Sequence, residues 1–340
     1  MSKKPILGIM LGDSGGVGPE IIAKLCANNF LTEQCRPILI GDFRILKRSL
    51  DIVGGSEVKI KLIDNIEDAS WDDEIPMFDR KNLDPEKNKI GIKTIESGAA
   101  CLDMLDLGVK YYKEGKIQGF CFGPLNKAAM KEAGCHYESE HHYLAHLLNH
   151  TEPFGEINVC ENVWTTRTTS HIPINEVSNN LTEETIGRAI RLSNYTLKNA
   201  GIKKPKIAVA ALNPHAGENG TCGREEIDVI IPAIETARNN GIDANGPFPS
   251  DILFIKAFRG EFDGVVTMYH DQGQIALKLR GFDQGITIAG GFEPPIVTCG
   301  HGTAYDIAGK NIVKTSAFEN AVKMTVQMAN AQAKVKGGKK

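Results

Sequence analysis

The chain has 340 residues, of which 41% are hydrophobic and 24% are charged, and its formal net charge is -3. This composition excludes a mainly disordered chain, and the near-balance of acidic and basic residues excludes the basic surface that nucleic acid or an anionic membrane requires. At roughly 150 residues per domain, a chain of this length is expected to form two domains.

The N-terminal segment MSKKPILGIMLGDSGG contains a short apolar stretch that runs directly into a turn, so we expect no signal peptide. The eight cysteines are scattered without a CxxC pair, which is typical of free thiols in a reducing compartment. No apolar run approaches the roughly 20 residues needed to span a bilayer. We therefore expect a cytoplasmic protein with no membrane partner and no nucleic-acid partner.

Apolar runs typical of buried strands alternate with helical patterns along the chain. Strands are expected at 6–11, 37–40, 58–63, 119–122, 157–163, 207–212 and 264–268, and helices at 18–25, 98–113, 182–199 and 225–240. The segment from 51 to 90 is polar and supports no other assignment. Such alternation favours an α/β fold with a largely parallel sheet that helices cover on both faces.

A glycine-rich segment from Gly12 to Gly18 follows the first expected strand and precedes the first expected helix. This is where a phosphate-binding loop is expected. However, the segment lacks the Gly-Lys-Ser/Thr ending of a P-loop, and Asp13 would place a negative charge against a pyrophosphate. A phosphate-binding loop and a purely structural turn both remain open.

Three histidines each follow a strand-like run and stand beside turn residues: His171, His215 and His270. Ends of parallel strands are where open α/β sheets bind ligands. Imidazole nitrogens suit zinc and similar divalent ions, and three protein ligands with one open position describe a catalytic site. No local spacing links the three histidines, so three separate loop residues are the alternative.

A second group of histidines, His142, His146 and His150, has the i, i+4, i+8 spacing of one helix face. The residues between the first two are Tyr-Leu-Ala, so the glutamate of a metalloprotease motif is missing. A solvated helix face is favoured over a metal site. Glu140 and His141 begin this helix, where their side chains can face a cleft.

Two aspartates are candidates for proton transfer. Asp271 directly follows His270, and Asp251 follows the rigid segment Gly-Pro-Phe-Pro. A carboxylate near a bound cation stays ionised and can accept or relay a proton. Capping of a helix or turn is the alternative role for each.

Several segments occur in an order and spacing that resemble those of one enzyme family: GDSGGVGPEI, SHIPI, LNPHAGENG, NGPFPSD, MYHDQG with Lys278, and HGTAYDIAGK. The chain resembles the 4-hydroxythreonine-4-phosphate dehydrogenases, the PdxA family of pyridoxal phosphate biosynthesis, from about residue 5 to about residue 330. The last segment also resembles the adenosine-binding loop of isocitrate and isopropylmalate dehydrogenases.

The resemblance implies a three-layer α/β/α fold of the isocitrate and isopropylmalate dehydrogenase type, with two domains around a cleft. Residues 1–130 and 275–340 would form the first domain, which carries the nucleotide loop. Residues 131–274 would form the second domain, which carries the metal ligands and the dimer contacts. The resemblance also implies a homodimer with its active site at the subunit interface.

The implied activity is the oxidation of a secondary alcohol in a phosphorylated or carboxylated hydroxy acid, with decarboxylation of the product. It uses NAD or NADP and a divalent cation such as zinc, magnesium, manganese or cobalt. By resemblance, His171, His215 and His270 bind the metal, and Asp251, Asp271 and Lys278 are catalytic. The implied nucleotide loop comprises His301, Gly302, Thr303, Ala304, Asp306 and Ile307. The acidic side chain of Asp306 near the ribose favours NAD over NADP.

The substrate end departs from the family pattern. Glu140 and His141 stand where the family has His-Thr, Thr287 replaces an asparagine, and Ile296 replaces an arginine. A phosphate monoester normally needs Arg or Lys. With Lys278, these positions are the expected substrate contacts.

We therefore expect weak turnover of 4-phosphooxy-threonine and better turnover of a related compound. The candidates are a threonate or erythronate 4-phosphate and a cis-dihydrodiol carboxylate. A catalytically inactive metal- or ligand-binding protein and an acyltransferase of similar architecture are the alternatives outside the oxidoreductases.

Overall fold

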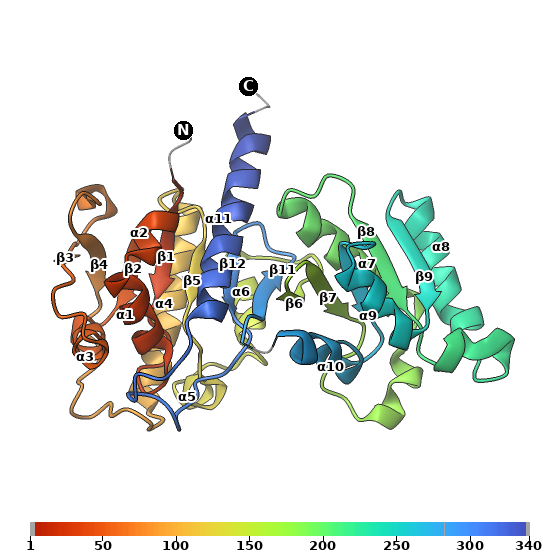
Figure 1. The fold of residues 1–340 in the computed structure, drawn as a ribbon, viewed down its shortest axis with the longest axis horizontal. Coiled ribbons are helices and arrows are strands. Elements are labelled where there is room, and N and C mark those ends of the chain that lie inside the picture. Colours follow the sequence, from red (N-terminus) through yellow and green to blue (C-terminus); the bar gives the residue numbers. More distant parts are fainter. Residues whose placement is uncertain (1–3, 282, 338–340) are drawn as a thin grey trace. The chain divides into compact units, whose positions relative to one another are not determined.

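The computed structural model describes residues 4–281 and 283–337. The chain forms two compact units: unit 1 comprises Met1–Thr151 and Pro294–Lys340, and unit 2 comprises Glu152–Glu293. Figure 1 shows the chain coloured from its N-terminus to its C-terminus. The α/β class expected from the sequence is confirmed in both units.

Unit 1 contains a parallel sheet with the strand order β3-β4-β2-β1-β5-β12. Its strands are β1 (Ile6–Met10), β2 (Arg36–Gly41), β3 (Ile60–Leu62), β4 (Ile75–Asp79), β5 (Phe120–Phe122) and β12 (Ile296–Cys299). Its helices are α1 (Gly18–Ala27), α2 (Phe30–Gln34), α3 (Phe43–Val53), α4 (Ile95–Lys113), α5 (Lys127–Glu132), α6 (Glu140–Leu148) and α11 (Ser316–Gly337), with a short 3-10 turn at Ile66–Asp68.

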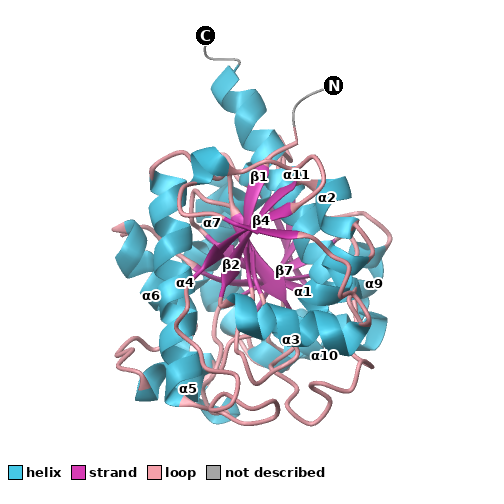
Figure 2. Ribbon diagram, turned by 90° about the vertical axis from the view of Figure 1, so that its left-hand side faces the viewer, coloured by secondary structure: helices cyan, strands magenta, loops and turns pink. Residues whose placement is uncertain are grey.

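The central strands of unit 1 are apolar on both faces because helices cover both faces. In β2, the five residues from Pro37 to Gly41 are all buried, the pattern typical of an internal parallel strand. Figure 2 shows α4 and α6 on one side of these strands, and α1 and α2 on the other. Helix α4 begins where the Thr94 side chain accepts a hydrogen bond from the backbone N–H of Ser97, which satisfies an end group of the helix.

Unit 2 contains a mixed sheet with the strand order β11-β6-β7-β10-β8-β9. Its strands are β6 (Gly155–Cys160), β7 (Val163–Arg167), β8 (Lys206–Ala210), β9 (Asp243–Phe248), β10 (Gly264–Thr267) and β11 (Ile286–Gly290). Its helices are α7 (Glu183–Asn199), α8 (Ile231–Asn239), α9 (Ser250–Phe258) and α10 (His270–Gly281), with 3-10 turns at Ile174–Glu176, Ser178–Asn180 and Pro214–Gly220 and a π turn at Glu226–Ile230.

The face of the unit 2 sheet that packs against α9 and α10 changes character along β7. Near the start of the strand, Val163 packs in an apolar cluster with Leu253 of α9 and Leu277 of α10. Further along, Thr165 and Arg167 share this face, because alternate residues of a strand point to the same side. The apolar part anchors the helices, and the polar part lies toward the carboxyl ends of β7 and β10, where α/β sheets bind ligands.

Several expectations are corrected by the observed elements. The expected strand 157–163 is an antiparallel hairpin of β6 and β7, which turns at Glu161 with φ 53°. Strand β6 also pairs antiparallel with β11, so unit 2 is less parallel than expected. The segment 51–90, expected to hold a single strand, also contains β4.

The unit boundaries fall after Thr151 and Glu293, not after 130 and 274 as expected. Packing explains the difference. Helix α6 packs against α4 of unit 1, and β11 pairs with β6 of unit 2. In the part of the chain that the structure describes, no helix has both the length and the apolar character needed to cross a membrane. The eight cysteines are free thiols, as expected, and all but Cys222 are buried.

Candidate active site

Two of the three expected metal ligands lie together in unit 2. The imidazole rings of His171 and His270 have centroids 5.5 Å apart. Two imidazoles that ligate one tetrahedral ion at about 2.0–2.1 Å place their ring centroids about 5 Å apart, so this spacing fits shared ligation. The register explains the meeting: Arg167, the last residue of β7, pairs with Thr267, the last residue of β10, and the two histidines follow these strand ends.

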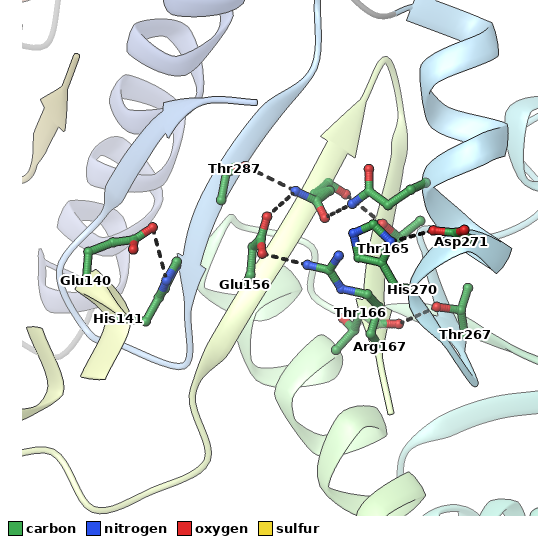
Figure 3. A network of polar contacts seen from close by, with 12 residues as sticks. Glu140, His141, Glu156, Thr165, Thr166, Arg167, Thr267, His270, Asp271 and Thr287 are labelled. Carbon is green, nitrogen blue, oxygen red and sulfur yellow. Dashed lines mark hydrogen bonds and ion pairs between the residues drawn. The ribbon is translucent and has the colours of Figure 1, made fainter. Parts of the chain in front are cut away.

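His270 is oriented by the residue that follows it. The Nδ1 atom of His270 lies 2.7 Å from Oδ1 of Asp271 (Figure 3). A carboxylate on one ring nitrogen fixes the tautomer and leaves Nε2 as the nitrogen that can bind a metal. Asp271 therefore supports His270 directly, in an arrangement that recurs in metal-binding histidines.

The Gln272 side chain joins three segments that carry candidate residues. Its Oε1 atom accepts from the backbone N–H of Met268 at 2.7 Å, and its Nε2 atom donates to the Ala211 carbonyl at 2.7 Å and to Ser250 Oγ at 2.8 Å. These contacts hold the turn before His270, the end of β8 and the first turn of α9 in one arrangement. Asp251 follows Ser250 and is exposed.

His215 lies in a backbone segment of unusual geometry. His215, Ala216, Glu218 and Asn219 all have positive φ values, of 52°, 55°, 44° and 54°. Each such residue costs on the order of 1–2 kcal/mol when it carries a side chain. The structure does not bring His215 into a set with the other two histidines, and the described residues contain no group of three or more His, Cys, Asp or Glu side chains placed to hold a metal.

A buried carboxylate holds this strained segment. Glu226 is 1% exposed and accepts three hydrogen bonds: from the backbone N–H of Leu212 at 2.8 Å, the backbone N–H of Asn213 at 2.7 Å, and Asn213 Nδ2 at 2.9 Å. A Cβ atom on Gly217 would lie 2.6 Å from Glu226 Oε2, so this position requires glycine. Glu226 could not be singled out from the sequence, because a glutamate in a helical pattern gives no sign of burial.

Unit 2 also contains a polar sheet face, formed by Glu156, Asn158, Thr165, Arg167 and Thr287 (Figure 3). Asn158 Nδ2 donates to Glu156 Oε1 at 2.9 Å and to Thr287 Oγ1 at 3.1 Å. Arg167 donates to Glu156 Oε2 at 2.6 Å. Gln274 of α10 donates to Asn158 Oδ1. Of these five residues, only Thr287 is a substrate contact expected from the sequence.

Helix α10 packs closely against β10, and this places Gln274 of the helix on the polar sheet face. A Cβ atom on Gly273 would lie 3.3 Å from Cγ2 of Thr267, so the glycine of the His-Asp-Gln-Gly motif permits the contact. Lys278 lies one turn beyond Gln274 on the same helix and is exposed. The polar residues of the segment VWTTR are consecutive and not alternating, so the sequence alone does not indicate which face of the strand is polar.

The remaining expected substrate residues lie in unit 1. His141 Nδ1 lies 3.7 Å from Glu140 Oε1 (Figure 3), and Lys127 Nζ lies 3.5 Å from Glu140 Oε2. His141 is buried. Ile296 is 0% exposed within β12, so its side chain belongs to the core of unit 1 and presents no surface to a substrate.

The expected nucleotide loop is braced by the glycine-rich segment at the start of α1. The backbone N–H of Val17 donates to the Thr303 carbonyl at 3.0 Å, and a Cβ atom on Gly16 would lie 2.8 Å from the same oxygen. Glu20 accepts from the backbone N–H of Gly309 at 2.7 Å. In the same loop, Gly302 and Asp306 are exposed. These contacts favour a structural role for the glycine-rich segment over phosphate binding. The segment supports the loop from 301 to 307.

Asp13 belongs to this glycine-rich segment, and its side chain is buried there. It is 0% exposed and accepts from the backbone N–H of Gly15 at 2.9 Å. Burial raises the pKa of Asp13, and hydrogen bonds from Gly15 and Tyr305 oppose that rise. Burial, followed by the nearby charge of Asp13, also raises the pKa of Tyr305. The Tyr305 hydroxyl in turn accepts from Asn126 Nδ2 at 2.9 Å.

The second histidine group does not form one helix face. Helix α6 ends at Leu148, so His150 lies beyond it. His142 Nδ1 lies 2.9 Å from Ser139 Oγ at the start of the helix, and the His146 ring stacks on Tyr137 with centroids 5.1 Å apart. These local contacts agree with the structural role that the sequence analysis favoured.

Paired imidazoles, a supporting carboxylate and a polar face at the carboxyl ends of strands define an α/β enzyme site. Comparison with known proteins gives its family. The family model described as "Pyridoxal phosphate biosynthetic protein PdxA" matches residues 33–325, and the chain belongs to this family.

Relatives and a solved structure agree over nearly the whole chain. A Pseudomonas aeruginosa protein named "Putative 4-hydroxythreonine-4-phosphate dehydrogenase 2" is 40% identical over 338 residues, which cover 97% of this chain and 98% of that protein. The D-threonate 4-phosphate dehydrogenase of Cupriavidus necator is 36% identical over 330 residues, covering 97% and 98%. The crystal structure of a 4-hydroxythreonine-4-phosphate dehydrogenase from Burkholderia phymatum is 36% identical, with a TM-score of 0.83 and coverage of 96% and 99%. These findings confirm the expected family, and they confirm that the protein is an oxidoreductase.

Proposed function

We propose that the protein is a dehydrogenase that uses a divalent cation and NAD to oxidise a secondary alcohol of a phosphorylated four-carbon 2-hydroxy acid. The observation that carries this proposal is the pairing of His171 and His270 at 5.5 Å, with Asp271 on the Nδ1 atom of His270. An imidazole whose tautomer is fixed by a carboxylate at Nδ1 is a ligand that suits zinc and similar ions.

His171, His215 and His270 would hold the cation, in a site shared between two copies of the chain. The strained geometry of the His215 segment supports this proposal, because backbone strain is typical of residues held for function. Since one chain does not gather the three histidines, a homodimer is the assembly that would complete the site. When bound, the cation would lower the pKa of the substrate hydroxyl and stabilise the resulting oxygen anion.

The protein's own residues would position the substrate and move protons. Asp271 is engaged by His270, so its role is to orient that ring. Asp251, held near the same segments through the contacts of Gln272, is then the better candidate for the base that accepts the hydroxyl proton. Lys278 would hold an anionic group of the substrate. The partly exposed loop of His301, Gly302, Thr303, Ala304, Asp306 and Ile307 would bind the nucleotide, with Asp306 favouring NAD over the 2′-phosphate of NADP.

The substrate assignment rests on two observations. The chain departs from the family pattern at Glu140, His141, Thr287 and Ile296, so its substrate end differs from that of the 4-hydroxythreonine-4-phosphate dehydrogenases. Relatives of nearly the same length act, by name, on D-threonate 4-phosphate. A threonate or erythronate 4-phosphate is therefore favoured. The family name favours 4-phosphooxy-threonine as the second candidate.

The proposal is tested by titrating NAD and NADP into the purified protein loaded with zinc, magnesium, manganese or cobalt, and then adding each substrate. We expect NAD to bind and to be reduced only when cation and substrate are both present. Absence of binding by either nucleotide would favour a catalytically inactive binding protein. Treatment with a chelator should abolish the reaction, and restoring the cation should recover it.

A further inference from the structure

We infer that Arg167 binds the carboxylate of the substrate and selects a 2-hydroxy acid over a 2-amino acid. This inference rests on the proposed function, and it adds a residue that the family resemblance does not supply. Its starting point is the polar sheet face of unit 2, where the Arg167 guanidinium lies near His270 (Figure 3), on the strand end that pairs with the end of β10.

The Arg167 side chain is only 6% exposed, and its ion-pair partner Glu156 is 35% exposed. The cost of removing the guanidinium from water offsets much of its attraction to the partly exposed Glu156, so the pair contributes little net stability. Stability alone therefore gives no reason for an arginine at the end of a strand whose neighbours on the other face are core residues. A ligand does give a reason.

Within the described residues, Glu156 is the hydrogen-bond partner recorded for this guanidinium. A guanidinium has five N–H donors in a rigid fork that matches a carboxylate, so donors remain for a second, incoming anion. Asn158 and Gln274 hold Glu156 and the neighbouring face in place, which fixes the direction of the fork. The result is a preorganised anion site.

The position of Arg167 identifies which anion it receives. Arg167 precedes His171 by four residues, and its register partner Thr267 precedes His270 by three. The alcohol that is oxidised must lie against the cation that these histidines would hold. In a 4-phosphorylated 2,3-dihydroxy acid, the carboxylate is adjacent to the hydroxyls, and the phosphate lies at the far end. The anion nearest the histidines is therefore the carboxylate.

The same charge explains selectivity. A 2-amino acid carries an ammonium group beside its carboxylate, and this group would be repelled by the guanidinium. The two carboxylate oxygens of Glu156 accept hydrogen bonds from Asn158 and Arg167, so Glu156 is directed toward these two side chains. A hydroxyl at the same carbon is neutral and can accept a hydrogen bond from Arg167.

The test measures binding of two probes by calorimetry to the full-length, metal-loaded protein and its variants. The probes are D-threonate 4-phosphate and D-threitol 4-phosphate, in which a neutral alcohol replaces the carboxylate. We expect Arg167→Gln to weaken binding of the threonate by roughly 10- to 150-fold, the loss of a charge-assisted contact, and to change binding of the threitol by less than about twofold. Arg167→Lys should recover part of the loss, since it restores the charge without the fork.

Arg191→Gln is the matched control, because Arg191 forms a 2.7 Å ion pair with Glu184 on the surface of the same unit. It should bind both probes as the wild type does. The thermal unfolding temperature of each Arg167 variant must also differ from that of the wild type by no more than that of Arg191→Gln does. Selectivity gives a second readout: Arg167→Gln should reduce the preference for the threonate over 4-phosphooxy-threonine at least tenfold.

Equal weakening of both probes in Arg167→Gln would overturn the inference while leaving the proposed function intact, as would unchanged binding of the threonate. A wild-type protein that binds neither probe and reduces no nucleotide would contradict the proposed function itself, and the inference with it.

Discussion

Replacing Glu226 with glutamine should loosen the His215 segment while leaving the fold intact. The Glu226 carboxylate accepts three hydrogen bonds at 2.7–2.9 Å from Leu212 and Asn213. Hydrogen bonds to a charged group contribute about 1.5–3 kcal/mol each, and glutamine keeps one acceptor oxygen but turns an N–H group toward N–H donors. We therefore expect the free energy of unfolding to fall by about 2–4 kcal/mol, with the loss concentrated in the segment that carries His215.

Two measurements separate this effect from a general loss of stability. Urea unfolding reports the free energy, and titration with a divalent cation reports metal affinity, which should fall by about 10- to 100-fold as for other residues that support a metal ligand. Glu184→Gln, at a carboxylate that is 77% exposed, should change neither. If Glu226→Gln lowered stability but left metal affinity unchanged, the proposed link between Glu226 and a His215 ligand would be wrong.

Three further predictions concern the metal site, the buried carboxylate of Asp13, and the carboxylate of Asp42 at the start of α3. His270→Ala should remove metal binding in calorimetry, whereas His142→Ala should not; the opposite pattern would move the metal site to α6. Burial raises the pKa of Asp13, so its protonation favours the folded state, and the stability of the wild type relative to Asp13→Asn should fall as pH rises above 3.8. For Asp42, burial is outweighed by hydrogen bonds from Arg44 and Leu83 and the pKa is lowered, so the wild type should instead lose stability relative to Asp42→Asn as pH falls below 3.8. Unfolding curves across pH should therefore slope in opposite directions.

The strands and helices with a strong apolar pattern were predictable from the sequence. Helix α7 follows its amphipathic spacing and begins directly after its N-cap residue Thr182, while β2 is an apolar run from Pro37 onward. The hairpin of β6 and β7 was not predictable as such, because its turn at Glu161 and Asn162 contains no glycine or proline. Strand β4 lies in a short segment bounded by charged residues, where periodicity carries little information.

Contacts in the candidate site were predictable where both residues belong to one sequence motif. His270 and Asp271 stand side by side in the sequence, and their contact follows from that proximity. Arg167 and Glu156 meet only through the antiparallel register of β6 and β7, and Gln272 joins three segments that are distant in sequence. Such contacts depend on tertiary pairing, and no local pattern reports them. Burial of Ile296 likewise follows from the sheet order, in which β12 lies beside β5.

The central claim is that the protein oxidises a phosphorylated hydroxy acid in a reaction that needs a divalent cation. The most direct test follows the absorbance of reduced nucleotide while the metal-loaded protein, with NAD, is given D-threonate 4-phosphate or 4-phosphooxy-threonine. We predict efficient turnover of the threonate, with kcat/KM above about 10⁴ M⁻¹s⁻¹, and turnover of 4-phosphooxy-threonine at least tenfold lower. Efficient oxidation of 4-phosphooxy-threonine with no reaction of the threonate would contradict the substrate assignment. Reduction of NAD with neither compound, or reduction that persists after the cation is removed with a chelator, would contradict the central claim.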